Sequence, residues 1–146
     1  MADSFDLDID ISQLIRNLRI TDTAVEKGGK RGVNDSIDEI IRISSDIAPL
    51  DKGILHKAHS REVTVSRGTI KAAVSYFVQE NGHNYALQMH EGEYNLGEGS
   101  RARPGTTGWS GKHYNVGNKY LERPMKGEEE AILKHIADEI KREIGG

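Results

Sequence analysis

The sequence predicts an α+β protein: an antiparallel sheet of three to four strands, packed by a long N-terminal helix and a C-terminal helix, with a long flexible loop. Apolar residues recur with helical spacing between residues 11 and 47 and again between residues 126 and 144. Between these regions, β-branched residues alternate with polar ones from about residue 55 to 77, which indicates strands. A chain of 146 residues is long enough to bury one core, so we expect one domain over residues 1–146.

The first helix opens with a capping signal. Residues 1–9 alternate acidic and apolar side chains, and we predict a flexible tail there. Asp10 stands as an N-cap, and Gln13 three residues later completes a capping box. The apolar face that follows runs to the end of the helix through Ile11, Leu14, Ile15, Leu18, Val25, Val33, Ile37, Ile40, Ile41 and Ile47.

Three glycines interrupt this helical pattern, namely Gly28, Gly29 and Gly32. Each costs about 1 kcal/mol in a helix interior, so the glycines either break the helix or allow another backbone to come close. We predict a break or kink within residues 27–32. Asn34 or Asp35 would then cap the second half of the helix.

A corner follows at residues 48–55, which read Ala-Pro-Leu-Asp-Lys-Gly-Ile-Leu. Pro49 has no backbone N–H and keeps the residue before it out of the helical region, so the helix is predicted to end at Asp46 or Ile47. The glycine of this segment suits a turn that needs an unusual backbone angle. We therefore predict a structural corner that consists of Pro49, Asp51, Gly53 and Leu55.

Strand signals fill the region from residue 55 to residue 91. Residues 55–65 and 69–77 are typical of a hairpin around Ser66-Arg67-Gly68. The polar residues 80–84 suit a turn that closes a further hairpin. Residues 85–91 fit a strand or a short helix, and we predict a strand.

The periodic pattern disappears between residues 92 and 116. Six glycines and Pro104 predict a long flexible loop without a packed element, and a loop of this length is typically functional or ordered only by a partner. Helical spacing returns from residue 126 or 127 to Ile144. Acidic residues at 128–130 suit the first turn of this helix, because they complement its dipole.

Composition excludes several classes of protein. The formal net charge of −3 is unlike that of a protein whose whole surface coats nucleic acid. The absence of cysteine excludes disulfides and thiolate metal sites. Acidic residues stand where a signal peptide would be basic and then apolar, and no apolar run approaches the roughly 20 residues that span a membrane. We therefore expect a soluble intracellular protein that does not contact membranes.

The sequence contains no pattern typical of an active site. The histidines that could bind a metal are widely spaced, at His83, His90 and His113. They do not form a known metal-binding motif such as His-Glu-x-x-His, so we expect no metal site. Ser75 and Ser110 lack the Gly-x-Ser-x-Gly elbow of many hydrolases. We therefore expect no enzyme, with no catalytic, cofactor-binding or metal-binding residues.

The loop and its exit carry four positive charges and two aromatic residues, which are Arg101, Arg103, Trp109, Lys112, Tyr114 and Lys119. These residue types contact phosphates and stack on bases, so a nucleic-acid-binding module that uses the basic loop 101–119 is one interpretation. A solvated loop that happens to be basic is a second. We favour a third, in which the six residues form a partner-binding assembly loop. Its counterpart is then the acidic N-terminal ten residues or the surface of another protein.

Three segments, taken in order, resemble the motifs of one family. The corner at residues 48–55 resembles A-P-x-D-T/K-G-x-L, and Tyr85-Ala86 with His90-Glu91-Gly92 is similar to Y-A-x-x-x-H/E-E-G. Residues 117–124, Gly-Asn-Lys-Tyr-Leu-Glu-Arg-Pro, resemble G-x-K-Y-L-x-x-P. These are motifs of the small neck proteins of tailed bacteriophages and prophages, which are described as minor capsid, head–tail joining or tail-completion proteins. The resemblance covers about residues 35 to 144.

This resemblance implies a structural virion component that joins the head connector or adaptor to tail proteins. Such subunits stay monomeric until they assemble into a ring, often a hexamer, at the head–tail interface of the virion; before assembly they lie in the host cytoplasm. No cofactor is implied, and DNA contact in the ring lumen is compatible with the role. The corner and residues 119–124 would be architectural. Residues 92–116 would reach a neighbouring subunit, the connector or the tail tube.

Overall fold

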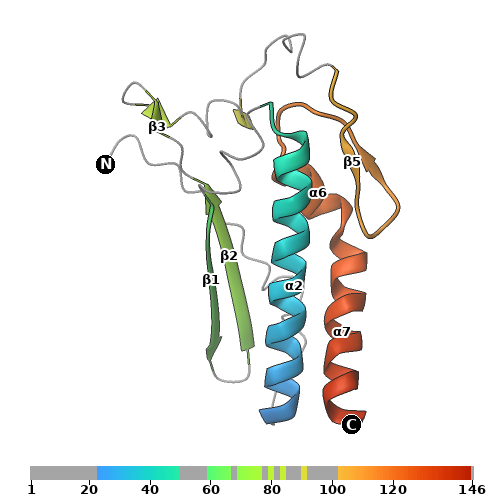
Figure 1. Ribbon diagram of the computed structural model, residues 1–146. Coiled ribbons are helices and arrows are strands. Elements are labelled where there is room, and N and C mark those ends of the chain that lie inside the picture. Colours follow the sequence, from blue (N-terminus) through green and yellow to red (C-terminus); the bar gives the residue numbers. More distant parts are fainter. Residues whose placement is uncertain are drawn as a thin grey trace.

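The computed structural model describes residues 23–49, 59–66, 69–76, 79–80, 83–84, 90–91 and 102–145. The helices and strands labelled in Figure 1 lie in these segments. In chain order they are α2 (Thr23–Ile47), β1 (His59–Ser66), β2 (Thr69–Tyr76), β3 (Gln79–Glu80), β4 (His83–Asn84), β5 (Thr106–Thr107), β6 (His113–Tyr114), α6 (Glu122–Gly127) and α7 (Glu129–Gly145).

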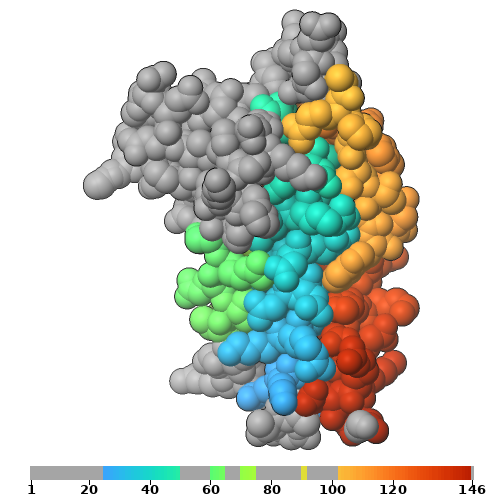
Figure 2. All heavy atoms as spheres, viewed as in Figure 1, coloured from blue at the N-terminus to red at the C-terminus, as the bar shows by residue number. Residues whose placement is uncertain are grey.

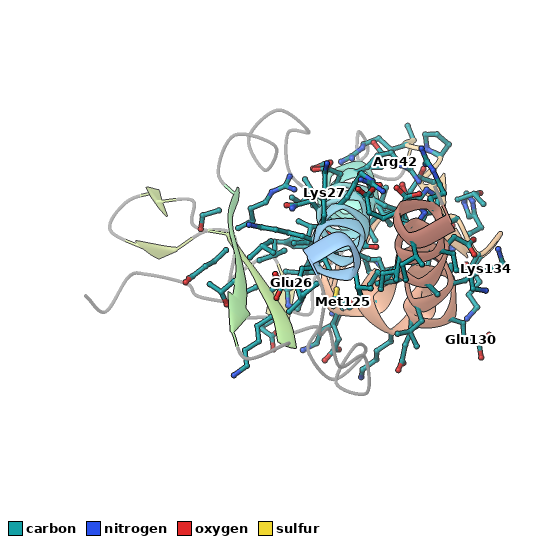
Figure 3. All side chains as sticks on the ribbon, turned by 90° about the horizontal axis from the view of Figure 1, so that it is seen from below. Glu26, Lys27, Arg42, Met125, Glu130 and Lys134 are labelled. Atoms are coloured by element: carbon teal, nitrogen blue, oxygen red, sulfur yellow. The ribbon has the colours of Figure 1, made fainter. Side chains whose placement is uncertain are left out.

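The helix α2 lies in the middle of the molecule. The β1–β2 hairpin runs along one side of α2, and α7 runs antiparallel to α2 along another side (Figure 1). The end-on view in Figure 3 shows the hairpin, α2 and α7 side by side. Helices and antiparallel strands therefore pack together, and the predicted α+β class is confirmed.

The core lies where these three elements meet. Most described residues of the predicted apolar stripes are buried: on α2 Val33, Ile37, Ile40, Ile41 and Ile47, and on α7 Ile132, Ile136 and Ile140. Alternate residues of β2, namely Ile70, Ala72 and Val74, are buried in the same cluster. A fully buried aliphatic side chain contributes about 1.5–3 kcal/mol, so these stripes dominate the stability of the fold.

Ile144, the last residue of the second stripe, is 59% exposed. The predicted tail over residues 1–9, the Asp10 cap and the start of the first stripe lie outside the described residues.

The helix α2 is continuous from Thr23 to Ile47, so the predicted break within residues 27–32 is wrong. A Cβ atom on Gly28 would stand 2.6 Å from the carbonyl oxygen of Glu139 on α7. A Cβ atom on Gly32 would stand 2.8 Å from the Cα atom of Ile136 on α7. The glycines therefore allow the backbones of α2 and α7 to come close, and burial along this seam outweighs the low helix propensity of glycine.

The prediction that Asn34 or Asp35 caps a second helix is also wrong, because α2 is not broken. The side-chain amide of Asn34 donates to the carbonyl oxygen of Lys30 at 3.0 Å, within the continuous helix. The carboxylate of Asp35 lies 2.8 Å from Nε2 of His135 on α7. The end of α2 at Ile47, in contrast, is the one that Pro49 predicted.

The described strands form three separate two-stranded antiparallel sheets, where one sheet of three to four strands had been predicted. In β1–β2 the register pairs Ser66 with Thr69, which confirms the hairpin with its tight connection. In β3–β4 Glu80 pairs with His83, so a second hairpin does form, but Glu80, His83 and Asn84 belong to its strands and not to the turn predicted over residues 80–84.

Two further predictions concern the ends of segments. His90 and Glu91 are helical, so the predicted strand over residues 85–91 is wrong at its end, and residues 85–89 lie outside the described residues. The C-terminal helix is confirmed as α7, and the short helix α6 precedes it. Pro124 is tolerated in the first turn of α6 because an N–H there has no partner within the helix.

In the described part of the chain, no helix is both long enough and apolar enough to cross a membrane.

Candidate functional site

Most of the predicted partner-binding loop is a packed hairpin. Residues 102–116 contain β5 and β6, and Thr106 pairs with Tyr114. Figure 2 shows this segment, in orange, lying along α2 and reaching α7. The prediction that residues 92–116 contain no packed element is therefore wrong for residues 102–116, while residues 92–101 lie outside the described residues.

One anchor of the hairpin is a charged pair on α2. Arg42 donates through Nε and Nη2 to the two carboxylate oxygens of Glu39, at 2.8 and 2.9 Å. The same guanidinium also donates to Oγ1 of Thr106 and to the carbonyl oxygen of Thr107, both at 2.8 Å. Glu39, which is nearly fully buried, accepts the backbone N–H of Trp109 at 3.1 Å. The pair therefore holds both the first strand and the tip of the hairpin.

A second anchor is Glu128, which lies between α6 and α7 and is fully buried. Its carboxylate accepts the backbone N–H and the hydroxyl of Ser110, at 2.9 and 2.5 Å, and the hydroxyl of Tyr114 at 2.7 Å. Burial, followed by the hydrogen bond to Glu128, raises the pKa of Tyr114. Gly108 must be small here, because a Cβ atom on it would meet the Glu128 carboxylate at 2.5 Å.

Arg103 is the third anchor, and it is a helix cap. Its guanidinium donates to the carbonyl oxygens of Ser45, Asp46 and Ala48, at 3.1, 2.6 and 2.6 Å. These carbonyls lie at the end of α2, whose last turn contains no basic residue of its own. A cation at this end satisfies carbonyl groups that lack helical partners and complements the helix dipole.

The remaining predicted basic residues also have intramolecular contacts where they are described. Nζ of Lys112 donates to the carbonyl oxygen of Gly127 at 3.1 Å. Nζ of Lys119 donates to Oε1 of Glu91 at 2.7 Å, and this hydrogen bond is the first cause of the raised pKa of Lys119 and of the lowered pKa of Glu91. Arg101 lies outside the described residues. The described cations are therefore spread over different contacts and do not form one basic face.

Of the two predicted aromatic contact residues, Trp109 lies on the surface and Tyr114 is buried. Trp109 lies at the tip of the hairpin with 44% of its surface exposed, and its ring lies 4.7 Å from the ring of His135 between centroids. The indole borders an open hollow of about 300 Å³, which Asp35, Asp38, Glu39, Arg42 and His135 also line. It borders a second hollow of about 430 Å³, which Ala131, Lys134, His135 and Asp138 also line. We call the indole and these two hollows the Trp109 surface.

A second site of interest is a buried junction at His90. The ring of His90 lies edge-on to Tyr120, with centroids 5.0 Å apart, and its Nδ1 contacts the carboxylate of Glu91. Nε2 accepts the backbone N–H of Glu122 at 3.4 Å, which leaves the proton of the neutral ring on Nδ1. Burial lowers the pKa of His90, so the neutral form is favoured.

The same junction connects the second and third of the segments that carry the family resemblance. The backbone N–H of Lys119, which has a φ of 52°, donates to the carbonyl oxygen of His90 at 2.8 Å. The backbone N–H of Gly117 donates to the carbonyl oxygen of Ile47 at 2.9 Å, next to the corner. Of the predicted corner residues, Pro49 is buried, and Asp51, Gly53 and Leu55 lie outside the described residues.

Sequence reasoning missed Glu39, Arg42 and Glu128. Glu39 and Arg42 were not singled out from the sequence, and Glu128 was interpreted only as one of three acids at a helix start. The only sequence signal was their position, because each lies on or beside a predicted apolar stripe. Within the described residues, no three His, Cys, Asp or Glu side chains are grouped so that they could hold a metal ion.

Comparisons with protein-family models, with curated proteins and with solved structures gave no match to this chain.

Proposed function

We propose that this chain is a non-enzymatic structural subunit of the head–tail interface of a tailed phage or prophage. It is a neck, tail-completion or minor capsid protein that assembles into a ring and joins the head connector to the tail. The contacts between two of its motif segments carry the proposal: Lys119 of the third segment donates to His90 and Glu91 of the second. Gly117 of the third segment donates to the carbonyl oxygen of Ile47, at the end of α2 just before the corner. Residues that are far apart in sequence but support one another in this way suit an architectural role.

The hairpin adds a second line of support. Two buried carboxylates, Glu39 and Glu128, hold the backbone N–H groups of Trp109 and Ser110. A large aromatic side chain held firmly at the surface is typical of a contact residue in a protein interface. In this proposal the hairpin is a fixed contact element, in place of the flexible arm that we predicted from the sequence.

The nucleic-acid-binding alternative has less support. Arg103, Lys112 and Lys119 each have an intramolecular partner, and the hollow lined by Asp35, Asp38 and Glu39 would repel a phosphate backbone. A duplex affinity that falls steeply with salt would favour this alternative nevertheless.

Sedimentation velocity tests the proposal. We expect the purified chain to sediment as a monomer alone, and to form a ring or co-sediment when heads or tails of the phage encoded by the same genome are added. Trp109→Ala should weaken co-sedimentation without changing the melting temperature, and Lys126→Ala, whose side chain is 77% exposed, is the matched control. A wild-type chain that stays monomeric and binds neither particle would refute the proposed role. Equal binding by wild type and Trp109→Ala would refute only the assignment of Trp109.

A further inference from the structure

We propose that the hollow beside Trp109 and Asp35 is a docking site for a cationic side chain, foremost an arginine, of a partner polypeptide. The inference goes beyond the proposed function, because it concerns the chemistry of the contact and holds for any partner.

The first argument is that the indole is exposed and fixed. Trp109 and Ile144 are the large apolar side chains exposed in the described part of the chain, and Ile144 lies near the end of α7. The tip that carries Trp109 is held by Glu39, which is 6% exposed, and by Glu128, which is fully buried. An indole in a fixed position loses little conformational entropy when a ligand stacks on it.

The second argument is the charge around the hollow. Asp35, Asp38 and Glu39 contribute three carboxylates. Two guanidinium groups face them, since Arg42 is bound through two nitrogens to Glu39 and Arg61 of β1 pairs with Asp38. Arg42 is also shared with Asp46 at 3.4 Å, and Asp35, whose side chain is 41% exposed, pairs with His135 and with neither guanidinium. Carboxylates are therefore in excess around the hollow, and an incoming cation would reduce this excess.

The third argument is geometric. His135 joins the two parts of the site, because its Nε2 lies 2.8 Å from the Asp35 carboxylate and its ring lies 4.7 Å from that of Trp109. The carboxylate and the indole thus border the same hollow of about 300 Å³. A guanidinium can stack on an aromatic face while its N–H groups donate to a neighbouring carboxylate, and an ammonium cannot do both in one plane.

The test uses the full chain and the peptide acetyl-Gly-Arg-Gly-amide, with the citrulline peptide as an uncharged isostere. Trp109 is the single tryptophan, so its indole N–H gives one nuclear magnetic resonance signal that reports on the site. At about pH 8, where histidine is neutral, we expect the arginine peptide to move this signal saturably. The citrulline peptide should leave it in place, and a lysine peptide should bind more weakly.

Two variants with the same change in charge make the test specific. Asp35→Asn should weaken binding of the arginine peptide by about two- to fivefold. Glu130→Gln, on α7 and pointing away from α2 in Figure 3, should leave the affinity unchanged. Melting curves of both variants confirm that they fold. The proposal is overturned if the citrulline peptide moves the signal equally, if no saturable shift occurs, or if Asp35→Asn and Glu130→Gln behave alike.

Discussion

The seam between α2 and α7 and the β5–β6 hairpin both pack against α2, but different forces hold them. Along the seam, Gly28 and Gly32 let two helix backbones approach until no Cβ atom fits, and the flanking isoleucines are buried. Polar contacts at the edge, such as Arg31 with Glu139 at 2.6 Å, accompany this apolar packing. The seam depends mainly on shape and on the removal of apolar surface from water.

The hairpin has short strands of two residues each, and such a ribbon is not stable by itself. It is held instead by hydrogen bonds to buried or half-buried charges, from Arg42 and Glu39 on α2 and from Glu128 before α7. Tyr114 contributes the one large apolar surface of the hairpin that joins the core. Because charged hydrogen bonds depend on direction, this arrangement fixes the tip and the orientation of Trp109.

Gly32→Ala is expected to give the largest effect and would break the seam. The added Cβ atom would meet the backbone of Ile136 at 2.8 Å, and a helix backbone cannot move aside without separating α2 from α7. We expect a loss of about 3 kcal/mol in the free energy of unfolding, although alanine has the higher helix propensity. Urea denaturation followed by circular dichroism measures this loss. Lys30→Ala, at an exposed position of the same helix, is the control and should change stability by less than about 0.5 kcal/mol.

If Gly32→Ala were as stable as the wild type, the seam would have to be looser than the structure shows. The explanation of why α2 continues through its glycines would then be wrong. A Gly32→Ala variant more stable than the wild type would contradict the close approach of α2 and α7 as well. In that case the higher helix propensity of alanine would be the only effect of the substitution.

Tyr114→Phe addresses the hairpin and is expected to have a smaller effect. It removes the hydroxyl that donates to Glu128 at 2.7 Å and keeps the buried ring. A hydrogen bond to a charged group contributes about 1.5–3 kcal/mol, and Glu128 keeps its two bonds from Ser110, so we expect a loss of about 1.5 kcal/mol. Urea denaturation gives the value, and hydrogen exchange at Ser110 shows whether the loss is local.

The control for this substitution is an exposed residue of α7. Lys134→Ala removes an exposed ion pair with Asp138 at 2.9 Å and should cost no more than a few tenths of a kcal/mol. Should Tyr114→Phe prove equally mild, the buried carboxylate would not be the main anchor of the hairpin.

The contrast between the two regions also explains how much the sequence could predict. The apolar stripes of α2 and α7, the hairpins at residues 59–76 and 79–84, and the end of α2 before Pro49 follow local rules of spacing and backbone geometry. The hairpin at residues 102–116 does not, because its partners lie far away in the chain. Arg103 binds carbonyls more than 50 residues before it, and no local pattern predicts that contact.

The candidate site was predictable in the same limited sense. Trp109 stood out as the only tryptophan of the sequence, but its neighbours in the Trp109 surface come from α2 and α7. Arg103 and Tyr114 were assigned to partner binding because they were basic or aromatic in a glycine-rich loop, and they turn out to cap a helix and to fill the core. Residue type alone cannot separate an exposed contact residue from a buried anchor.

The smallest expected effect concerns the junction at His90 and asks whether it behaves like the hairpin or like the seam. Burial in the folded state lowers the pKa of His90 below its ordinary value of 6.5. Below pH 6.5 the unfolded chain therefore binds more protons than the folded chain. Stability is therefore full above about pH 6.5 and declines toward pH 5, with a slope that one group limits to about 1.4 kcal/mol per pH unit. At the edge of the seam, the Arg31 guanidinium lowers the pKa of Glu139 below its ordinary value of 4.5, so this carboxylate stays ionised in this window. His90→Gln keeps an acceptor and a donor but no titratable group, so the difference in unfolding free energy between wild type and variant should shrink on acidification. A constant difference from pH 7.5 to 5 would mean that the junction, like the seam, depends mainly on packing.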